Sequence, residues 1–389
     1  MVRDLEEKHG PSSECRICGG AMDALHDFSS FKRVTSDCRP WPAGGALAVC
    51  SNCGTVLKPT DLKWTEETKN IYSGYSIYSQ SNGVETAIFE MNAGAPSLRS
   101  EKIVDFLTEV HKLPTSGRLL DVGCGNGAFL RAFAKRASGW SLAGTELSET
   151  NKQQIENIPG VERLYCTPPS DVPGVFDVIS LIHVIEHIPD PSDFLVSLYS
   201  KLNQSGALLV ELPNHEENPF DLLIADHCNH FTPATLEYFF LRNGIKPLAV
   251  RSDWISKEIT AFASGDRETA TTELSSGASN AGGRIARSIS WLKSVRSAAM
   301  DLSARNPIGF FGASIGASWL FGELDGAVSF FVDEDPNRFG KSHLGKKIYS
   351  PESVPAGSTV FIPLPEKIAA RIRERLGDGS VEYVTPPAF

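Results

Sequence analysis

Short apolar runs alternate with amphipathic stretches along the middle of this chain. The apolar runs have the length of buried strands, and the stretches between them repeat apolar residues every three or four positions, as one face of a helix does. The predicted strands cover residues 118–123, 140–147, 161–166, 176–183 and 206–212. The predicted helices cover residues 101–111, 127–137, 149–157 and 192–202. Strands that alternate with helices favour an α/β fold with a central doubly wound, Rossmann-like parallel sheet.

The same alternation returns near the C-terminus. Residues 284–305 are predicted to form a helix, and residues 307–312 a strand that leads into a glycine turn. Further strands are expected over 328–333 and 359–363, and a Ser-, Gly- and Thr-rich connection over 264–283 precedes the whole region. This pattern predicts a second, smaller Rossmann-like unit. Its glycines alone are weak evidence for a ligand, so a role without a second cofactor is favoured, and a substrate-nucleotide site stays open.

Length and charge narrow the possible partners. A chain of 389 residues is expected to form two or three domains. Its net charge of −10 argues against broad electrostatic binding to nucleic acid or to an anionic membrane. No apolar run approaches the roughly 18 residues that cross a bilayer, and the charged N-terminus does not resemble a signal peptide. We therefore expect a cytoplasmic protein, in which cysteines are thiols or metal ligands rather than disulfides.

Four cysteines near the N-terminus have the spacing of a metal site. Cys15 and Cys18 form one C-x-x-C pair, Cys50 and Cys53 form a second, and each pair is followed by glycine. Two such turns can present four thiolates to one tetrahedral Zn²⁺ and leave no place for water or substrate, which predicts a structural zinc. The alternatives are free thiols on unrelated surface turns or a redox pair, and redox sites use one pair on a βαβ unit rather than two on loops.

A glycine-rich turn follows the first predicted strand of the middle region. Asp121, Gly123, Gly125 and Gly127 occupy alternate positions there. Glycine lets the backbone bend sharply and approach a ligand closely. Glu146 ends the next predicted strand, where its carboxylate can accept hydrogen bonds from both ribose hydroxyls of a nucleoside. NAD sites share these features, but their G-x-G-x-x-G spacing differs and Asp121 would repel a pyrophosphate, so a cationic nucleoside is favoured.

These residues resemble motif I of the class I S-adenosylmethionine-dependent methyltransferases. Glu146 matches the ribose-binding acid of that family, and residues 176–187 and 202–214 resemble its fourth and fifth strand motifs. The match covers roughly residues 100–250. It implies S-adenosylmethionine as cofactor, bound by Asp121, the three glycines and Glu146, with His183 assigned to the same site. Tyr165-Cys166-Thr167 stands where many relatives carry an adenine-binding Asp, which leaves the adenine contact open.

The order of the parts resembles the three-domain nucleotide-sugar C-methyltransferases. We place a zinc-binding domain at 1–70, a methyltransferase domain at 71–265 and a C-terminal Rossmann-like domain at 284–389. Residues 311–314 and 332–337 echo the C-terminal pattern of that family. The resemblance implies a nucleotide-linked ketosugar as substrate and a histidine base that removes the proton beside the ketone. Partners other than the nucleotide sugar are not expected, except that a homodimer is left open.

A histidine-containing loop follows the fifth predicted strand. His227 carries over from the family as the base, with Asp226 as its partner, and His230 is a further candidate for proton transfer near neutral pH. Either histidine could instead bond backbone or zinc-domain groups. The family motif Tyr-x-Glu-His is only partly present, because Ile224 and Asp226 replace its tyrosine and glutamate. Thr232 is predicted to cap the helix that follows.

Three tyrosines at helical spacing, Tyr72, Tyr75 and Tyr78, precede the methyltransferase region. They form either a lid over the substrate or an ordinary aromatic linker. The leading hypothesis is therefore a methyltransferase that acts on a carbon of a nucleotide-linked ketosugar. The alternatives are an O-methyltransferase that acts on a polysaccharide or glycolipid sugar, and a non-catalytic scaffold that retains the fold. An NAD-dependent oxidoreductase is disfavoured by the spacing of the glycine turn.

Overall fold

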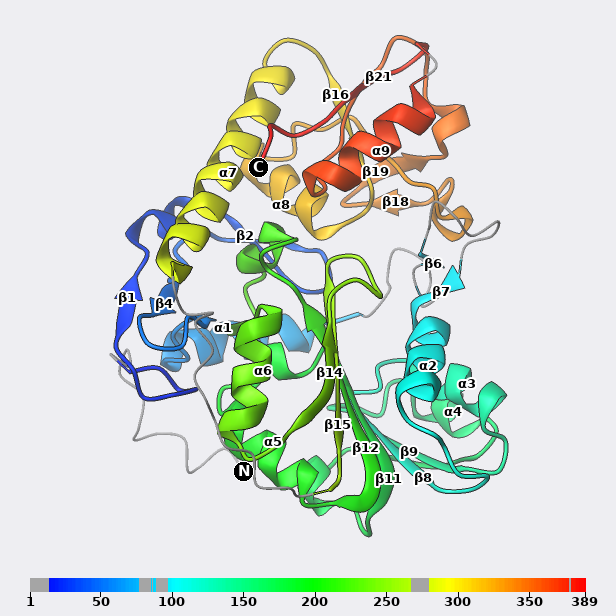
Figure 1. Cartoon of the computed structure of the whole chain (residues 1–389). Helices are drawn as coiled ribbons and strands as arrows, with labels where there is room; N and C mark the ends of the chain where they lie inside the picture. The colour runs from blue at the N-terminus through cyan, green and yellow to red at the C-terminus, as the bar shows by residue number, and fades with distance from the viewer. Residues whose placement is uncertain (1–13, 77–84, 86, 89–96, 267–279, 378) are drawn as a thin grey trace.

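The computed structural model describes residues 14–76, 85, 87–88, 97–266, 280–377 and 379–389 of the chain (Figure 1). Within these ranges the strands form three larger sheets, of four, seven and six strands, and two small two-stranded ones. The largest sheet lies in the middle of the sequence, where the predicted α/β fold is confirmed. The predicted domain boundaries stay a prediction, because side chains from all three regions share packed interiors.

The seven-stranded sheet has the order β10-β9-β8-β11-β12-β15-β14. Its strands are β8 (Arg118–Val122), β9 (Ser141–Thr145), β10 (Val161–Tyr165), β11 (Phe176–Ile182), β12 (Leu202–Pro213), β14 (Pro247–Arg251) and β15 (Glu258–Ser264). The first five in this order run parallel, and β15 and β14 are antiparallel to their neighbours. The chain order reverses beside β8, so the carboxyl ends of β8 and β11 flank the crevice in which such sheets bind ligands.

Helices cover both faces of this sheet (Figure 1). They are α2 (Arg99–Val110), α3 (Ala128–Arg136), α4 (Lys152–Glu156), α5 (Pro191–Tyr199) and α6 (Pro233–Arg242). The predicted strands and helices are all present. Their boundaries shift by a few residues: the helix expected to reach residue 202 ends at Tyr199, and the strand expected to begin at residue 206 begins at Leu202. The reason is that Leu202 already pairs with Phe176 of β11.

The N-terminal sheet includes one strand that belongs to the histidine loop. Its order is β1-β4-β5-β13, and β13 (Asn229–His230) lies far along the chain from the other three. The N-terminal elements are β1 (Met22–Ala24), β2 (Arg33–Val34), β3 (Pro40–Trp41), β4 (Ala48–Cys50), β5 (Val56–Leu57) and α1 (Leu62–Ser73). The pair β6 (Ala87–Ile88) and β7 (Ser97–Leu98) follows. The cysteine-bearing region is thus tied to the histidine loop by backbone hydrogen bonds.

The C-terminal sheet has the order β18-β19-β17-β16-β20-β21. Its elements are α7 (Ala281–Ser303), β16 (Ile308–Phe311), α8 (Ile315–Glu323), β17 (Phe330–Val332), β18 (Ser342–His343), β19 (Lys346–Tyr349), β20 (Thr359–Phe361), α9 (Glu366–Leu376) and β21 (Glu382–Val384). All of its pairs except β18 with β19 are parallel, which agrees with the predicted Rossmann-like pattern. Among the described residues, no helix is long and apolar enough to cross a membrane.

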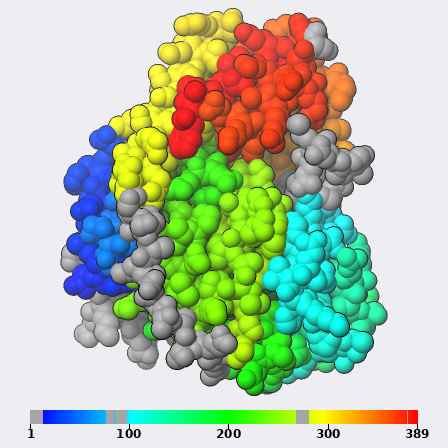
Figure 2. Space-filling model, viewed as in Figure 1, coloured from blue at the N-terminus to red at the C-terminus, as the bar shows by residue number. Residues whose placement is uncertain are grey.

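One hydrophobic core joins the N-terminal, loop and C-terminal regions. Phe220, which precedes the histidines, is 2% exposed and packs its ring edge-on against Trp291 at 5.3 Å between ring centroids. The Trp319 ring lies 5.9 Å from both Phe220 and Phe31. Figure 2 shows these regions packed directly against one another, with α7 between the N-terminal and C-terminal parts. The histidine loop is therefore anchored from two sides.

Candidate active site

Glycine is required at the turn after β8. Gly123, Gly125 and Gly127 all adopt left-handed backbone conformations, with φ of +66°, +59° and +81°. A Cβ atom on Gly123 would lie 2.8 Å from Val184 Cγ2, and one on Gly127 would lie 2.7 Å from Ile158 Cδ1. Other residues would therefore be strained and would collide with neighbours. The turn leads directly into α3 and brings main-chain groups to the edge of the sheet.

A buried carboxyl group, Asp121, and a half-buried one, Glu146, flank this turn. Glu146 Oε1 accepts a hydrogen bond from the Gly125 N–H at 2.5 Å, and its Oε2 accepts one from the Leu147 N–H at 3.0 Å. Asp121 is 2% exposed, and its Oδ1 accepts a hydrogen bond from Ser180 Oγ at 2.7 Å. Burial raises the pKa of Asp121 to about 7, and the nearby charge of Glu146 adds to this shift. Two carboxyl groups that disfavour each other's charge suit a cationic nucleoside better than a pyrophosphate.

His183 lies at the carboxyl end of β11, where the sequence placed it, and holds a neutral ring. Its Nε2 accepts a hydrogen bond from the Arg99 guanidinium at 2.6 Å, and its Nδ1 lies 3.1 Å from Glu186 Oε1. Because an arginine can only donate, the ring proton sits on Nδ1 and points to Glu186. Burial lowers the pKa of His183 to about 4. Arg99 Nε also lies 3.7 Å from Glu211 Oε1, and burial raises the pKa of Glu211 to about 8.

Asp221 joins the two histidines of the loop. Its Oδ1 lies 2.7 Å from His227 Nδ1 and its Oδ2 lies 2.5 Å from His230 Nδ1, and all three side chains are buried. Burial works against the charge of Asp221, but His230 and His227 outweigh it and hold its pKa well below the usual range. Burial also works against a charged His227, yet the bond to Asp221 and its charge raise the pKa of His227 above 6.5.

The prediction that Asp226 pairs with His227 was wrong in its geometry. Asp226 points instead to the N-terminal region, where its Oδ1 accepts a hydrogen bond from the Ser36 N–H at 2.9 Å and its Oδ2 accepts one from Ser36 Oγ at 2.5 Å. The His227 N–H bonds the Ile224 carbonyl at 3.3 Å, and this turn directs the two neighbouring side chains apart. Asp226 acts on His227 only through its charge, as the weakest of the causes that shift the pKa of His227.

His187 lies against His227, with ring centroids 4.5 Å apart and planes nearly perpendicular. Its Nδ1 is 3.0 Å from the Tyr72 hydroxyl and 3.1 Å from the Asp226 carbonyl. Tyr72 therefore reaches the histidine cluster from α1, and the choice between a lid and an aromatic linker stays a prediction. Tyr78 lies outside the described residues. Glu186, His187 and His227 each bring one possible ligand atom within 4.8 Å of the others, a spacing that a metal cation would suit.

The four predicted zinc ligands come together. The ligand atoms of Cys15, Cys18, Cys50 and Cys53 all lie within 4.8 Å of one another. Cys15 Sγ is 3.7 Å from Cys53 Sγ, and Cys18 Sγ is 3.5 Å from Cys50 Sγ. Tetrahedral Zn²⁺ with Zn–S bonds of about 2.3 Å needs sulfur atoms about 3.8 Å apart, so the donor set fits that ion. Backbone N–H groups at Ile17, Gly20, Asn52 and Cys53 point to the sulfurs at 3.4 Å.

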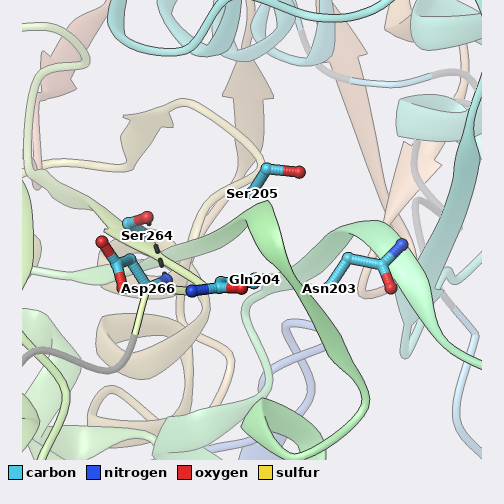
Figure 3. A pocket seen from close by; sticks show the side chains of 5 residues that line it. All are labelled: Asn203, Gln204, Ser205, Ser264 and Asp266. Carbon is cyan, nitrogen blue, oxygen red and sulfur yellow. Dashed lines mark hydrogen bonds between the residues drawn. The ribbon is translucent and has the colours of Figure 1, made fainter.

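A polar hollow lies at the amino end of β12 (Figure 3). The glycine turn and the histidines described above lie at the carboxyl ends of the strands instead. The lining of the hollow comes from the start of β12 and the end of β15, and consists of Asn203, Gln204, Ser205, Ser264 and Asp266. Ligands of open α/β sheets bind beyond the carboxyl ends of the strands, whereas this hollow lies at the amino end of β12. It is therefore not part of the candidate active site.

Two residues of the site were missed by the sequence analysis. Asp221 carries no motif signal and lies six positions before His227, so only the folded loop brings the two together. His215 lies two residues after the end of β12, is 3% exposed, and has no hydrogen-bond partner for either ring nitrogen. The pattern Pro213-Asn214-His215 at the end of a predicted strand was the one available signal for it.

Comparison with known proteins supports the central assignment. Residues 97–250 match the family model described as a methyltransferase domain. The mitochondrial ubiquinone biosynthesis O-methyltransferase of Schizosaccharomyces pombe is 27% identical over 173 residues, which are 40% of this chain and 62% of that protein. The ubiquinone biosynthesis O-methyltransferase of Pseudomonas entomophila is 30% identical over 114 residues, 28% of this chain and 48% of that protein. The chain thus spans about half to three fifths of the relatives that it matches.

Among solved structures, a 1,6-didemethyltoxoflavin-N1-methyltransferase of Burkholderia thailandensis is 14% identical and has a TM-score of 0.37. The similarity covers 54% of this chain and 95% of that one. The family match coincides with the seven-stranded sheet, the glycine turn and Glu146. This chain therefore carries a class I S-adenosylmethionine-dependent methyltransferase domain.

Proposed function

We propose that this protein transfers a methyl group from S-adenosylmethionine to an acceptor whose proton is removed by His227. The hydrogen bond between Asp221 and His227 carries the proposal. A carboxylate on Nδ1 fixes the ring proton there and leaves the Nε2 lone pair as the base. The negative charge of Asp221 then stabilises the imidazolium that proton removal creates. This arrangement of a buried carboxylate and a histidine is that of a general base.

The turn after β8 and Glu146 would hold the nucleoside of the cofactor. Glu146, held by the Gly125 N–H, offers a carboxylate at one edge, and the buried Asp121 carboxyl group lies behind the turn. His183, which the sequence assigned to the cofactor, borders the same edge from the end of β11. When bound, the sulfonium group supplies an electrophilic methyl group. The protein residues orient the reactants and keep water from them.

For the acceptor we propose a carbon beside the keto group of a nucleotide-linked sugar. The resemblance of the chain to the nucleotide-sugar C-methyltransferases supports this choice. The N-terminal region that carries the two C-x-x-C pairs, here called the cysteine unit, precedes the methyltransferase domain and the C-terminal sheet in the same order. His227 would remove the proton beside the ketone. Asp226 and His230 stay candidates for supporting roles, with Asp226 acting through its charge and His230 through Asp221.

A second candidate function is methylation of an oxygen. The two matched relatives are O-methyltransferases of ubiquinone biosynthesis, and the same base could remove a hydroxyl proton. The acceptor would then be a hydroxyl of a sugar or of another hydroxylated ring. The two functions differ in whether a carbon-bound proton becomes exchangeable.

Labelled S-adenosylmethionine and a panel of nucleotide ketosugars, nucleotide hydroxysugars and catechols test these proposals. Incubation of a ketosugar in deuterated water without the cofactor should exchange the proton beside the ketone if carbon is methylated. His227→Asn should abolish transfer and exchange but leave cofactor affinity unchanged, whereas the exposed His26→Asn is the matched control. Transfer only to a catechol would overturn the sugar proposal, and full activity of His227→Asn would remove it as the base.

We also infer a structural Zn²⁺ at Cys15, Cys18, Cys50 and Cys53. Four sulfurs at tetrahedral spacing with N–H groups directed at them support this inference. The protein as purified should contain one equivalent of zinc by elemental analysis, released only on unfolding or with a strong chelator. A protein that lacks zinc but is fully folded would contradict it.

A further inference from the structure

His215 is a buried histidine without a hydrogen-bond partner for its ring. Its side chain is 3% exposed, and neither Nδ1 nor Nε2 has a partner. The backbone N–H of His215 donates a hydrogen bond to the Phe231 carbonyl at 3.4 Å. Phe231 follows His230 in the sequence. His215 therefore stands where β12 ends and meets the histidine loop. Burial lowers the pKa of His215, so the ring is neutral and offers one N–H donor and one lone pair.

His230 adds a second unpaired group. Its Nδ1 is 2.5 Å from Asp221 Oδ2, while its Nε2 is buried without a partner. Because a carboxylate only accepts, the ring proton is on Nδ1 and Nε2 is a bare lone pair. Burial lowers the pKa of His230 to about 3, which keeps the ring neutral. The charge of Asp221 acts on both histidines, and the backbone bond from His215 to Phe231 places His215 next to the segment that carries His230.

Buried polar groups of proteins nearly always find a partner, and each one left alone costs stability. Together the two rings lack partners for two lone pairs and one N–H. A ligand that satisfies them must supply at least two donors and one acceptor close together. Neighbouring hydroxyl groups do this, since each hydroxyl donates once and accepts.

We propose that His215 and His230 form a binding site for hydroxyl groups of the acceptor, beside the base His227. This inference rests on the proposed methyl transfer and names what the acceptor must carry. A phosphate at neutral pH offers acceptors almost exclusively, and Asp221 would repel it. The sugar ring rather than the diphosphate of a nucleotide sugar therefore occupies this position, and His230 is a binding residue rather than a second base.

His215→Leu tests the proposal with the full-length protein. Leucine fills a similar volume and removes only groups that have no partner in the protein, so the melting temperature should stay the same or rise. The KM for a nucleotide hexose that is methylated should rise roughly tenfold, with a smaller change in kcat. The KM for the deoxy analogue that lacks the contacted hydroxyl should be the same in both proteins. These two effects together would be absent if His215 only supported the fold.

His343→Leu is the matched control. His343 is also a buried histidine, but its Nε2 is 2.8 Å from Ser318 Oγ in the C-terminal sheet region. Its replacement should lower the melting temperature and leave KM unchanged. A lower melting temperature of His215→Leu with an unchanged KM would overturn the proposal, since internal water would then satisfy the ring. Absence of transfer to any hydroxylated acceptor in the wild-type protein would instead refute the proposed function.

Discussion

Asp221→Asn is the sharpest test of the active-site geometry. Asparagine has the size of aspartate, so the buried loop need not rearrange. It removes the negative charge that contacts His227 at 2.7 Å and His230 at 2.5 Å. Its amide can also donate to His227 Nδ1, which would move the ring proton to Nε2 and abolish the base. We expect a large loss of kcat with little change in cofactor affinity, because Glu146 and the glycine turn are untouched.

The size of the effect follows from the contacts. A hydrogen bond to a charged group contributes about 1.5–3 kcal/mol, and every 1.4 kcal/mol corresponds to about a tenfold change. Loss of the bond to His227 therefore predicts a decrease in kcat of roughly 10- to 100-fold. The reversed tautomer would increase the loss to about 10⁴-fold, as for the corresponding change in a Ser-His-Asp triad.

The pH dependence has a defined sign. Asp221 raises the pKa of His227 above 6.5 despite burial, and a base works only when unprotonated. In the wild-type protein kcat/KM should thus fall as the pH decreases through a value above 6.5. In Asp221→Asn the remaining activity should fall only at lower pH. Radiolabelled methyl transfer from pH 5 to 9 measures both effects.

Asp226→Asn is the control, because it removes a neighbouring buried charge without touching the His227 ring. It should retain most of the activity and shift the pH profile only slightly. Circular dichroism and the melting temperature show whether each variant is folded. Equal losses in the two variants, or a profile of Asp221→Asn that matches the wild type, would refute the assignment of Asp221 as the residue that orients the base.

Three further predictions address the rest of the site. Glu146→Gln should weaken binding of S-adenosylmethionine by roughly 10- to 100-fold in calorimetry, and unchanged affinity would exclude Glu146 from the nucleoside site. Cys50→Ser should release zinc in elemental analysis and lower kcat; a variant that loses zinc yet keeps full activity would contradict a link to the histidine loop. Phe220→Ala should destabilise the protein by about 3–5 kcal/mol in denaturant unfolding, because the ring is 2% exposed beside two tryptophans, and a change below about 1 kcal/mol would mean that the loop is not anchored there.

The fold of the middle region was predictable because its signals are local. The strand β8 and the turn formed by the left-handed glycines are both determined by residues that lie close together in the sequence. The same holds for Thr232, which caps α6 as predicted, with its hydroxyl accepting from the Thr235 N–H at 3.2 Å. Each C-x-x-C pair is also a local signal, whereas the meeting of the two pairs depends on the folding of the N-terminal region between them.

The partner of His227 was not predictable in this way. Adjacency suggested Asp226, but adjacent side chains diverge when the backbone turns, as it does at the Ile224 carbonyl. Asp221 meets the histidines only because Phe220 is fixed in the core between α7 and α8. The two-residue strand β13 also lacks a periodic signal, because two residues are too few to show alternation.

The pairing of β13 with β5 explains why a cysteine unit belongs to this site. The histidine loop has little regular structure of its own, yet a general base must be held precisely enough to meet its proton. The cysteine unit supplies that support. The Lys58 N–H bonds the Cys228 carbonyl at 3.0 Å, and Arg16, within the first C-x-x-C pair, reaches the same carbonyl at 3.4 Å and the Pro189 carbonyl at 3.5 Å.

Loosening the cysteine unit should therefore displace the base before it affects the cofactor site. The glycine turn lies on β8 and α3, and no described hydrogen bond or ion pair joins it to the cysteine pairs. In a titration with chelator, kcat should fall with the loss of zinc while the affinity for S-adenosylmethionine stays constant. A simultaneous loss of both would mean that the zinc supports the fold as a whole rather than the loop that carries His227.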